Sequence, residues 1–262
     1  EKKIRNTSIM ETYIKQIYSL LIMKKSILLI AMILLGTSLN AQWWKRIKGN
    51  GNTITQTRQT ADYDKVSVSG SFDVQLVQGK EGDIILKGEE NLLEYIEVAV
   101  KNNVLVLKVK DNINLSSSWN KSISIEVPVT EIAAVKLSGS GDISSEITLA
   151  ARDFNAAVSG SGDISLNIDA TNLVVQVSGS GDMKLTGSAQ DLQVKISGSG
   201  DLNAYGVAVE DATVTVSGSA DVKVTVRGTL NAKVSGSGDI QYKGNPKKVV
   251  SKVSGSGDVT GY

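Results

Sequence analysis

The sequence predicts an all-β protein whose larger part is a right-handed parallel β-helix, or β-solenoid, with about 19 residues per repeat, behind a less regular N-terminal β region. Three observations predict it. A short motif recurs at nearly constant spacing, apolar and polar residues alternate through each copy, and the chain has 25 glycines but two prolines and two phenylalanines. This composition suits short strands and tight turns better than a bundle of helices.

The repeated motif is Ser-Gly-Ser-x-Asp. Its copies begin at Ser69, Ser138, Ser159, Ser178, Ser197, Ser217, Ser235 and Ser254. From Ser138 onward, successive copies are 21, 19, 19, 20, 18 and 19 residues apart. This regularity is typical of a stacked array, because one such coil is too small to bury its apolar side without neighbours.

Residues around the motif alternate between two kinds of side chain. Odd-numbered positions from 175 to 185 are apolar or glycine, and even-numbered positions from 176 to 184 are polar. A period of two indicates a half-buried strand. We therefore expect the motif glycines to point inward, where the core is thin, and its serines and aspartate to point outward. Phe72 and Ala220 occupy the fourth motif position in two copies, so only the second position, always glycine, is expected to need a positive φ.

The N-terminal end resembles a secretory leader. Two lysines follow Met23, residues 26–36 form an apolar run, and residues 37–41 end in alanine. We interpret residues 1–41 as an upstream extension plus a cleaved signal peptide, with translation starting at Met23. The mature form is then expected to have no stable membrane span and to be exported, whether periplasmic, cell-surface or secreted. It would carry 22 basic and 25 acidic residues, a net charge of −3, which does not favour nucleic-acid binding.

The rest of the chain divides into two expected regions. Residues 50–130 are predicted to be an N-terminal β-rich region, and residues 131–262 the repeat solenoid. Within the first, residues 97–107 predict a hairpin that turns at Asn102 and Asn103, and residues 90–95 can form one helical turn. The first region is either a separate domain or a cap over the end of the solenoid, and the sequence leaves both open.

Several ordered segments carry a resemblance to a known family. They are GNGN at 49–52, DYDKVSVSGSFDVQLVQG at 62–79, NLLEYIEV at 91–98, SISIEVP at 122–128 and the repeats that follow. Together they resemble the "head GIN" domain family of autotransporter adhesins, over residues 49–262. The resemblance implies an all-β fold with a β-helical C-terminal part and a secreted or surface location. It carries over no functional residues.

Seven aspartates, one in each motif copy from residue 138 onward, are candidate ligand-binding residues. They are Asp142, Asp163, Asp182, Asp201, Asp221, Asp239 and Asp258. Stacked about 4.8 Å apart, neighbouring carboxylates would repel by roughly 3.5 kcal/mol at an effective dielectric near 20. Calcium between the coils could offset this, but one carboxylate per coil is few for an ion that takes six to eight oxygens.

A second way to offset the repulsion needs no metal. Lysines flank most copies at outward positions, namely Lys136, Lys184, Lys195, Lys223, Lys233 and Lys252. Serine hydroxyls or backbone N–H groups in the bend could also donate to the carboxylates. We favour this arrangement, and therefore expect no cofactor and no metal site, with calcium as the alternative.

The residue types argue against catalysis. The chain contains no histidine and no cysteine, which removes the commonest general base and all thiolate chemistry. We expect no catalytic residues and a non-enzymatic, exported adhesin or binding module for an extracellular glycan or surface protein. Trp119, in a polar stretch, is a candidate for stacking on a sugar, unless it covers the end of the core. The alternatives are a glycan-processing β-helix enzyme with paired carboxylates and a calcium-binding scaffold.

Overall fold

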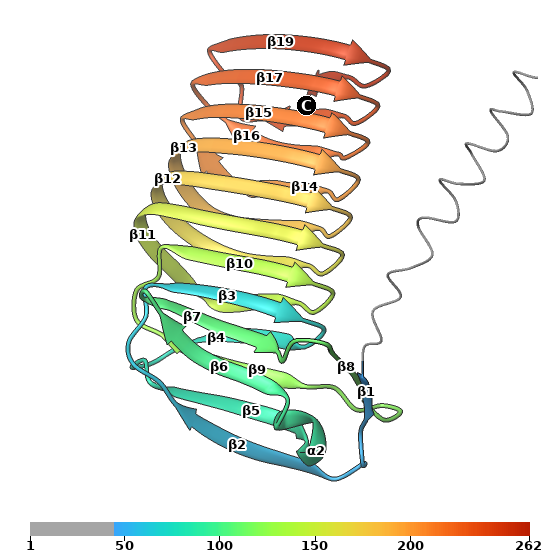
Figure 1. The fold of residues 1–262 in the computed structure, drawn as a ribbon. Coiled ribbons are helices and arrows are strands. Elements are labelled where there is room, and N and C mark those ends of the chain that lie inside the picture. Colours follow the sequence, from blue (N-terminus) through green and yellow to red (C-terminus); the bar gives the residue numbers. More distant parts are fainter. Residues whose placement is uncertain (1–44) are drawn as a thin grey trace, which may run out of the picture. The chain divides into compact units, whose positions relative to one another are not determined.

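The computed structural model describes residues 45–262, which form one compact unit. The predicted leader, residues 1–41, lies outside the described residues. Within the described range the regular elements are strands, apart from the single-turn helix α2 (Glu90–Leu93), and the predicted all-β solenoid is confirmed (Figure 1). In this range no helix is long and apolar enough to cross a membrane.

The solenoid has two long sides, and each is a ladder of parallel strands. Its strands are β10 (Ala134–Gly139), β11 (Ile143–Gly160), β12 (Ile164–Gly179), β13 (Met183–Gly198), β14 (Leu202–Val209), β15 (Asp211–Gly218), β16 (Val222–Val226), β17 (Thr229–Gly236), β18 (Ile240–Lys243), β19 (Lys248–Gly255) and β20 (Val259–Gly261). Strands β11, β12 and β13 each run along both sides of a coil. Later coils divide, so that β15, β17 and β19 continue one side and β14, β16, β18 and β20 the other.

Equivalent motif positions lie beside one another in successive coils. Ser178 is the register partner of Ser197, and Ser197 is the partner of Ser217. The first serines of neighbouring copies are paired in this way at every step from Ser69 to Ser254. The repeat in sequence is therefore a repeat in space, and the first two residues of each motif lie beside their counterparts in the next coil.

The core is a column of apolar side chains between the two ladders. The residue before the motif is buried in seven copies: Val68, Leu137, Val158, Val177, Ile196, Val216 and Val234. The residue after the aspartate is buried in the same copies: Val74, Ile143, Ile164, Met183, Leu202, Val222 and Ile240. The alternation read from the sequence is thus confirmed. In the last coil, by contrast, the equivalent Val253 is 41% exposed.

The two motif glycines are required for different reasons. At the second position φ is positive in seven of the eight copies, as expected, and Gly179 has a φ of +119°. A Cβ there would lie 2.3 Å from the carbonyl oxygen of Gly160 in the preceding coil. At the fourth position φ is not positive, yet a Cβ on Gly181 would lie 2.1 Å from the oxygen of Gly162. The expectation that a thin core demands glycine is wrong, because the close neighbour is the backbone of the adjacent coil.

The N-terminal region closes one end of the solenoid (Figure 1). It contains β1 (Lys45–Lys48), β2 (Thr53–Gln59), β3 (Lys65–Gly70), β4 (Asp73–Gln78), β5 (Asp83–Glu89), β6 (Ile96–Lys101), β7 (Val104–Val109), β8 (Ile113–Ser116) and β9 (Ser124–Val129). Strands β3 and β4 extend the two ladders by pairing with β10 and β11, and β7 and β9 lie parallel beyond them.

Antiparallel strands and a short helix then end the stack on this side. Strand β6 pairs with β7 in the predicted hairpin, and both Asn102 and Asn103 have a positive φ. Strand β5 lies between β9 and β2, antiparallel to both. The predicted helical turn is α2. Strand β1 pairs with β8 in a separate two-stranded sheet.

Candidate binding groove along the aspartate turns

In the motif copies that begin at Ser138, Ser159, Ser178 and Ser197, backbone donors of four consecutive residues hold the turn. In one copy, the N–H groups of Ser180 and Gly181 both donate to the carbonyl of Gly160 in the preceding coil, at 2.8 and 3.1 Å. The N–H of Asp182 instead donates to a side-chain carboxylate. The next residue, Met183, donates in the opposite direction, to the carbonyl of Asp201 in the following coil. One side-chain acceptor per coil therefore completes the hydrogen bonding of the turn.

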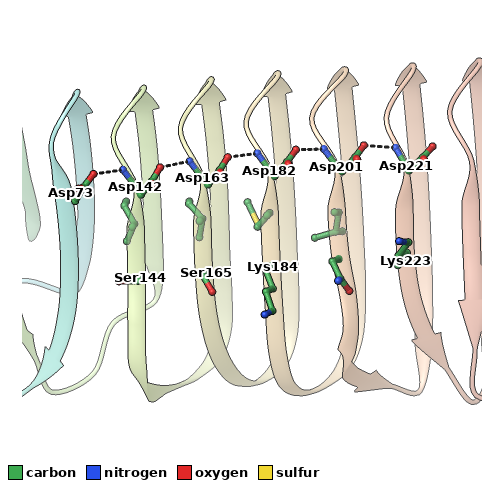
Figure 2. A pocket seen from close by; sticks show the side chains of 15 residues that line it. Asp73, Asp142, Ser144, Asp163, Ser165, Asp182, Lys184, Asp201, Asp221 and Lys223 are labelled. Atoms are coloured by element: carbon green, nitrogen blue, oxygen red, sulfur yellow. Dashed lines mark hydrogen bonds between the residues drawn. The ribbon is translucent and has the colours of Figure 1, made fainter.

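That acceptor is the aspartate of the preceding coil (Figure 2). We define the aspartate ladder as Asp73, Asp142, Asp163, Asp182, Asp201, Asp221, Asp239 and Asp258. From Asp142 onward, the N–H of each ladder aspartate donates to Oδ1 of the aspartate in the preceding coil, at distances from 2.8 to 3.3 Å. The structure brings all seven predicted aspartates into one row and adds Asp73, which the sequence reading left out although it belongs to the first motif copy.

The backbone N–H groups, rather than lysines, are the direct partners of these carboxylates. A hydrogen bond from an N–H to an ionised carboxylate is among the stronger kinds, and it offsets part of the repulsion along the row. Within residues 45–262 the four ion pairs involve no member of the aspartate ladder. The flanking lysines thus form no direct ion pair with the aspartate ladder in the described residues, and the expected donation by backbone N–H groups in the bend is confirmed.

A groove follows the aspartate ladder over six coils. Its volume is about 690 Å³, which lies within the range of 300–1,000 Å³ common for small-molecule sites. The lining residues are Asp73, Asp142, Ile143, Ser144, Asp163, Ile164, Ser165, Asp182, Met183, Lys184, Asp201, Leu202, Asn203, Asp221 and Lys223. With coils about 4.8 Å apart, the groove extends over roughly 24 Å along the stack.

Six aspartates, two serines, one asparagine and two lysines line the groove, together with four apolar residues at the strand starts. The labelled side chains of Ser144, Ser165, Lys184 and Lys223 come from the strand starts directly after the aspartates (Figure 2). Among described residues, Oδ1 of each aspartate from Asp73 to Asp239 accepts an N–H from the next coil. Oδ2 is then left as a regularly spaced acceptor that a ligand can reach.

Trp119 lies in the loop between β8 and β9 and is 90% exposed. It does not cover the end of the core, which was the alternative role considered for it. Nor does it line the groove along the aspartate ladder. The structure therefore does not unite the two sets of predicted ligand-binding residues.

The loop that carries Trp119 is fixed through a buried carboxylate that sequence reasoning missed. Glu89, at the end of β5, is 1% exposed. It accepts hydrogen bonds from the N–H of Ser118 at 2.8 Å, from Oγ of Ser118 at 2.6 Å and from the N–H of Gly51 at 2.5 Å. Burial alone would raise the pKa of Glu89, but these bonds and the charge of Lys121 hold it below its ordinary value.

Gly49, in the segment at 49–52, has to be a glycine because of the same carboxylate. A Cβ on Gly49 would lie 2.0 Å from the Glu89 carboxylate. Next to it, the N–H of Asn50 donates to Oδ1 of Asn91, and Nδ2 of Asn91 donates to the carbonyl of Lys48. Two segments quoted above for the family resemblance thus meet around Glu89. In the sequence, Glu89 is one acidic residue in a charged stretch, and nothing marks it as buried.

The groups needed for metal binding do not converge. No set of three or more acidic residues in the described part of the chain is placed to hold a metal ion. Members of the aspartate ladder are spread one to a coil, and each from Asp73 to Asp239 already accepts a backbone N–H.

Comparison with known proteins agrees with this architecture. Residues 62–246 match the family model described as "Putative auto-transporter adhesin, head GIN domain". The chain belongs to this family. The segments that suggested the resemblance are those that form the first coil and the cap. A search among curated proteins found no match.

Solved structures of similar proteins share the fold of this chain. A "putative adhesin" from Bacteroides fragilis is 24% identical, with a TM-score of 0.76, and the match covers 82% of this chain and 100% of that one. A "putative lipid binding protein" from Parabacteroides distasonis is also 24% identical, with a TM-score of 0.70, over 83% and 100%. A second P. distasonis protein, a "putative adhesin", is 25% identical, with a TM-score of 0.62, over 83% and 100%. None of these descriptions names an enzymatic activity.

Proposed function

We propose that this head GIN protein is a non-enzymatic, exported binding module that holds an extended extracellular glycan in the groove along the aspartate ladder. The observation that carries the proposal is the groove itself, a straight channel over six coils with the same acceptor presented at each coil. A surface that presents the same acceptor at each coil suits a ligand whose donors also recur at regular intervals. A linear polysaccharide offers hydroxyl donors at regular intervals, and several of them could bind successive Oδ2 atoms.

The chemistry of the groove supports a neutral or amino-bearing sugar over an acidic one. Six carboxylates and two lysines line it, so its net charge is negative. An acidic polymer would be repelled unless cations accompanied it. The family name supports a surface-binding role, and the signal-like leader supports export.

Trp119 supplies a second contact of the kind glycans use. Its indole is exposed, and the neighbouring Ser118 is held by Glu89, so the loop that presents it is anchored. An exposed aromatic ring stacks on the apolar face of a sugar at little entropic cost when its loop is already ordered.

The proposal is tested on a glycan array with the purified protein and two matched variants. Asp182→Asn replaces the acceptor Oδ2 with an NH₂ group inside the groove, and Asp191→Asn makes the same change at an exposed position on β13 outside it. We expect wild type and Asp191→Asn to bind the same glycans and Asp182→Asn to lose at least tenfold in affinity. Trp119→Ala tests the second contact separately. An array that stays blank while a surface protein is captured, or equal binding by both aspartate variants, would overturn the proposal.

A further inference from the structure

Four of the lysines that flank the motifs lie on a different side of the solenoid from the aspartate groove. Lys136, Lys195, Lys233 and Lys252 each stand two residues before a motif, and none of them lines that groove. They belong to the ladder made by β3, β10, the second halves of β11, β12 and β13, and then β15, β17 and β19, which lie one above another (Figure 1). We call the outward side of these strands the lysine face.

The charges on the lysine face are all positive. Its outward positions form three columns in register, with one residue from each strand, and the first column consists of the first serines of the eight motifs. The second, the lysine column, is Ser67, Lys136, Ala157, Gln176, Lys195, Thr215, Lys233 and Lys252, and the third is Lys65, Ala134, Asn155, Val174, Gln193, Thr213, Asn231 and Val250. The three columns contain five lysines and no acidic residue.

The chain itself does not neutralise these five lysines. All five are exposed, and the four ion pairs within residues 45–262 involve Lys101, Lys108 and Lys247 instead. Lys233 and Lys252 are register partners in adjacent coils, and like charges that lie side by side in a sheet repel. An anionic group bound between them would offset this repulsion.

A groove of about 600 Å³ opens on the same face where β3, β10 and β11 lie together. Lys65 and Lys136 line it, and the short side chains of Ala134 and Ala157 leave room beside them. Asp153 is the one acidic residue among the described residues that line the groove, and it lies outside the three columns. A ligand in the groove would therefore lie beside two cations.

The nearest acidic residues mark the edge of the lysine face. Asp153, Asp191 and Asp211 occupy the next outward column, and Asp191 is the register partner of Asp211. Asp191 stands four residues before Lys195, which is about 13 Å along an extended strand. That distance exceeds the screening length of about 8 Å at physiological ionic strength. The acidic edge therefore leaves the lysine column positive and disfavours a polyanion that strays from it.

The arrangement of the charges indicates what kind of anion fits. From Lys136 to Lys252 successive lysines of the column are three, two and one coils apart, roughly 14, 10 and 5 Å. Charges on a line suit a linear polyanion, whereas a flat anionic surface would be met better by cations spread in two dimensions. The three columns contain no aromatic residue, so nucleic-acid bases would have no ring on which to stack.

We propose that the lysine face binds a linear acidic polysaccharide, which lies along the stack with its carboxylates or sulfates on the lysine column. Neutral side chains flank that column, with the motif serines on one side and Gln193 and Thr213 on the other, and they can bond sugar hydroxyls. This site does not rest on the glycan proposed for the aspartate ladder, where the same polymer would be repelled. With both sides occupied, one molecule would join an acidic polymer to a neutral or amino-bearing one.

The test is calorimetric titration of the purified protein, in calcium-free buffer, with polygalacturonate, dextran sulfate and uncharged dextran. We expect both acidic polymers to bind, more weakly as sodium chloride is raised, and dextran not to bind. The triple variant Lys136→Gln/Lys195→Gln/Lys233→Gln should lose about tenfold in affinity, because each exposed charge pair contributes a few-fold. Binding of dextran as tight as that of polygalacturonate would overturn the proposal.

A matched control separates the lysine face from the overall charge of the protein. Lys80→Gln/Lys87→Gln/Lys247→Gln removes the same number of charges from exposed positions outside the face. It should bind the acidic polymers within about twofold of wild type, since distant charges are screened. Circular dichroism establishes that both triple variants are folded. Equal loss in the two would overturn the proposal, and so would binding to anionic lipid vesicles or to an acidic protein with none to either acidic polysaccharide.

A second measurement locates the polymer on the surface. Lysines are acetylated with and without bound polygalacturonate, and the modified positions are read by mass spectrometry. We expect the polymer to protect Lys136, Lys195 and Lys233 and to leave the modification of Lys80 unchanged. Protection of Lys184 instead would place the polymer in the groove along the aspartate ladder and would contradict the proposal.

Discussion

The N–H of Asp182 donates to Oδ1 of Asp163 at 2.8 Å, across two neighbouring coils. The same bond recurs from Asp73 to Asp258, and it gives each aspartate a structural role in addition to any part in binding. In the folded protein, each carboxylate from Asp73 to Asp239 therefore accepts a hydrogen bond from a backbone N–H of the next coil. Several consequences of this arrangement are measurable.

Removal of one carboxylate should destabilise the fold modestly. Asp182→Ala leaves the N–H of Asp201 without its acceptor, at a cost of about 1 kcal/mol because water can partly replace it. Asp182→Asn keeps a carbonyl acceptor and removes one charge from the row, so its free energy of unfolding should equal or exceed that of wild type. Urea denaturation measures both. Equal loss in the two variants would show that the charge matters and the acceptor does not.

Gly179 should tolerate no side chain. Gly179→Ala places a Cβ against the Gly160 carbonyl and imposes a φ of +119°, so we expect a loss of roughly 3 kcal/mol or more, and Gly179→Val should be worse. Gly82→Ala is the matched control, since φ is +124° there but the nearest atom, the Thr60 carbonyl oxygen, lies 3.6 Å from the added carbon. It should cost only the backbone strain, about 1–3 kcal/mol. Thermal melting of both variants separates the close contact from the backbone strain, and similar losses would contradict the stacking.

The Glu89 carboxylate should make the free energy of unfolding depend on pH. Its pKa is lower in the folded protein than in the unfolded chain, so its contribution is fully present above the unfolded value and is lost as pH falls through the folded value. Glu89→Gln replaces one acceptor oxygen with an NH₂ group that cannot accept the bonds from Ser118 and Gly51. We expect it to lose roughly 1–3 kcal/mol at neutral pH and to show a flatter stability profile below pH 5. Parallel profiles for the two proteins would contradict this.

Calcium should not stabilise the protein. Each aspartate from Asp73 to Asp239 already accepts an N–H, and no described cluster offers the six to eight oxygens that the ion takes. The melting temperature measured with excess chelator should match that measured with millimolar calcium. If calcium raised the melting temperature of wild type, and raised it less in Asp182→Asn, the result would instead favour a calcium-binding scaffold.

The solenoid could be predicted from sequence because the repeat copies within the chain can be aligned with one another. Eight motif copies show which positions vary, and Phe72 and Ala220 correctly indicated that the fourth position needs no positive φ. The partner of each aspartate was harder to predict, because the donor belongs to the next coil and its position depends on the turn. Lysines next to the motifs were an electrostatically sensible alternative, but in the structure they do not contact the carboxylates.

The region around Glu89 could not be predicted from sequence in the same way. It occurs once, so there are no copies to compare, and its partners Gly51 and Ser118 are 38 and 29 residues away in the chain. In the sequence, a buried glutamate within a charged stretch has the same pattern around it as a solvent-exposed one.

The in-register stacking of equivalent residues in adjacent coils is tested most directly by pairs of cysteines introduced into this cysteine-free chain. Ser178 and Ser197 are register partners in adjacent coils, so their Cα atoms should lie about 4.8 Å apart, within the range that a disulfide bridges. Ser178 and Ser217 are two coils apart, roughly 9.6 Å, which is too far. After mild oxidation, mass spectrometry should find an intramolecular disulfide in Ser178→Cys/Ser197→Cys and none in Ser178→Cys/Ser217→Cys. The reverse result, or no bridge in either, would contradict the stacked register.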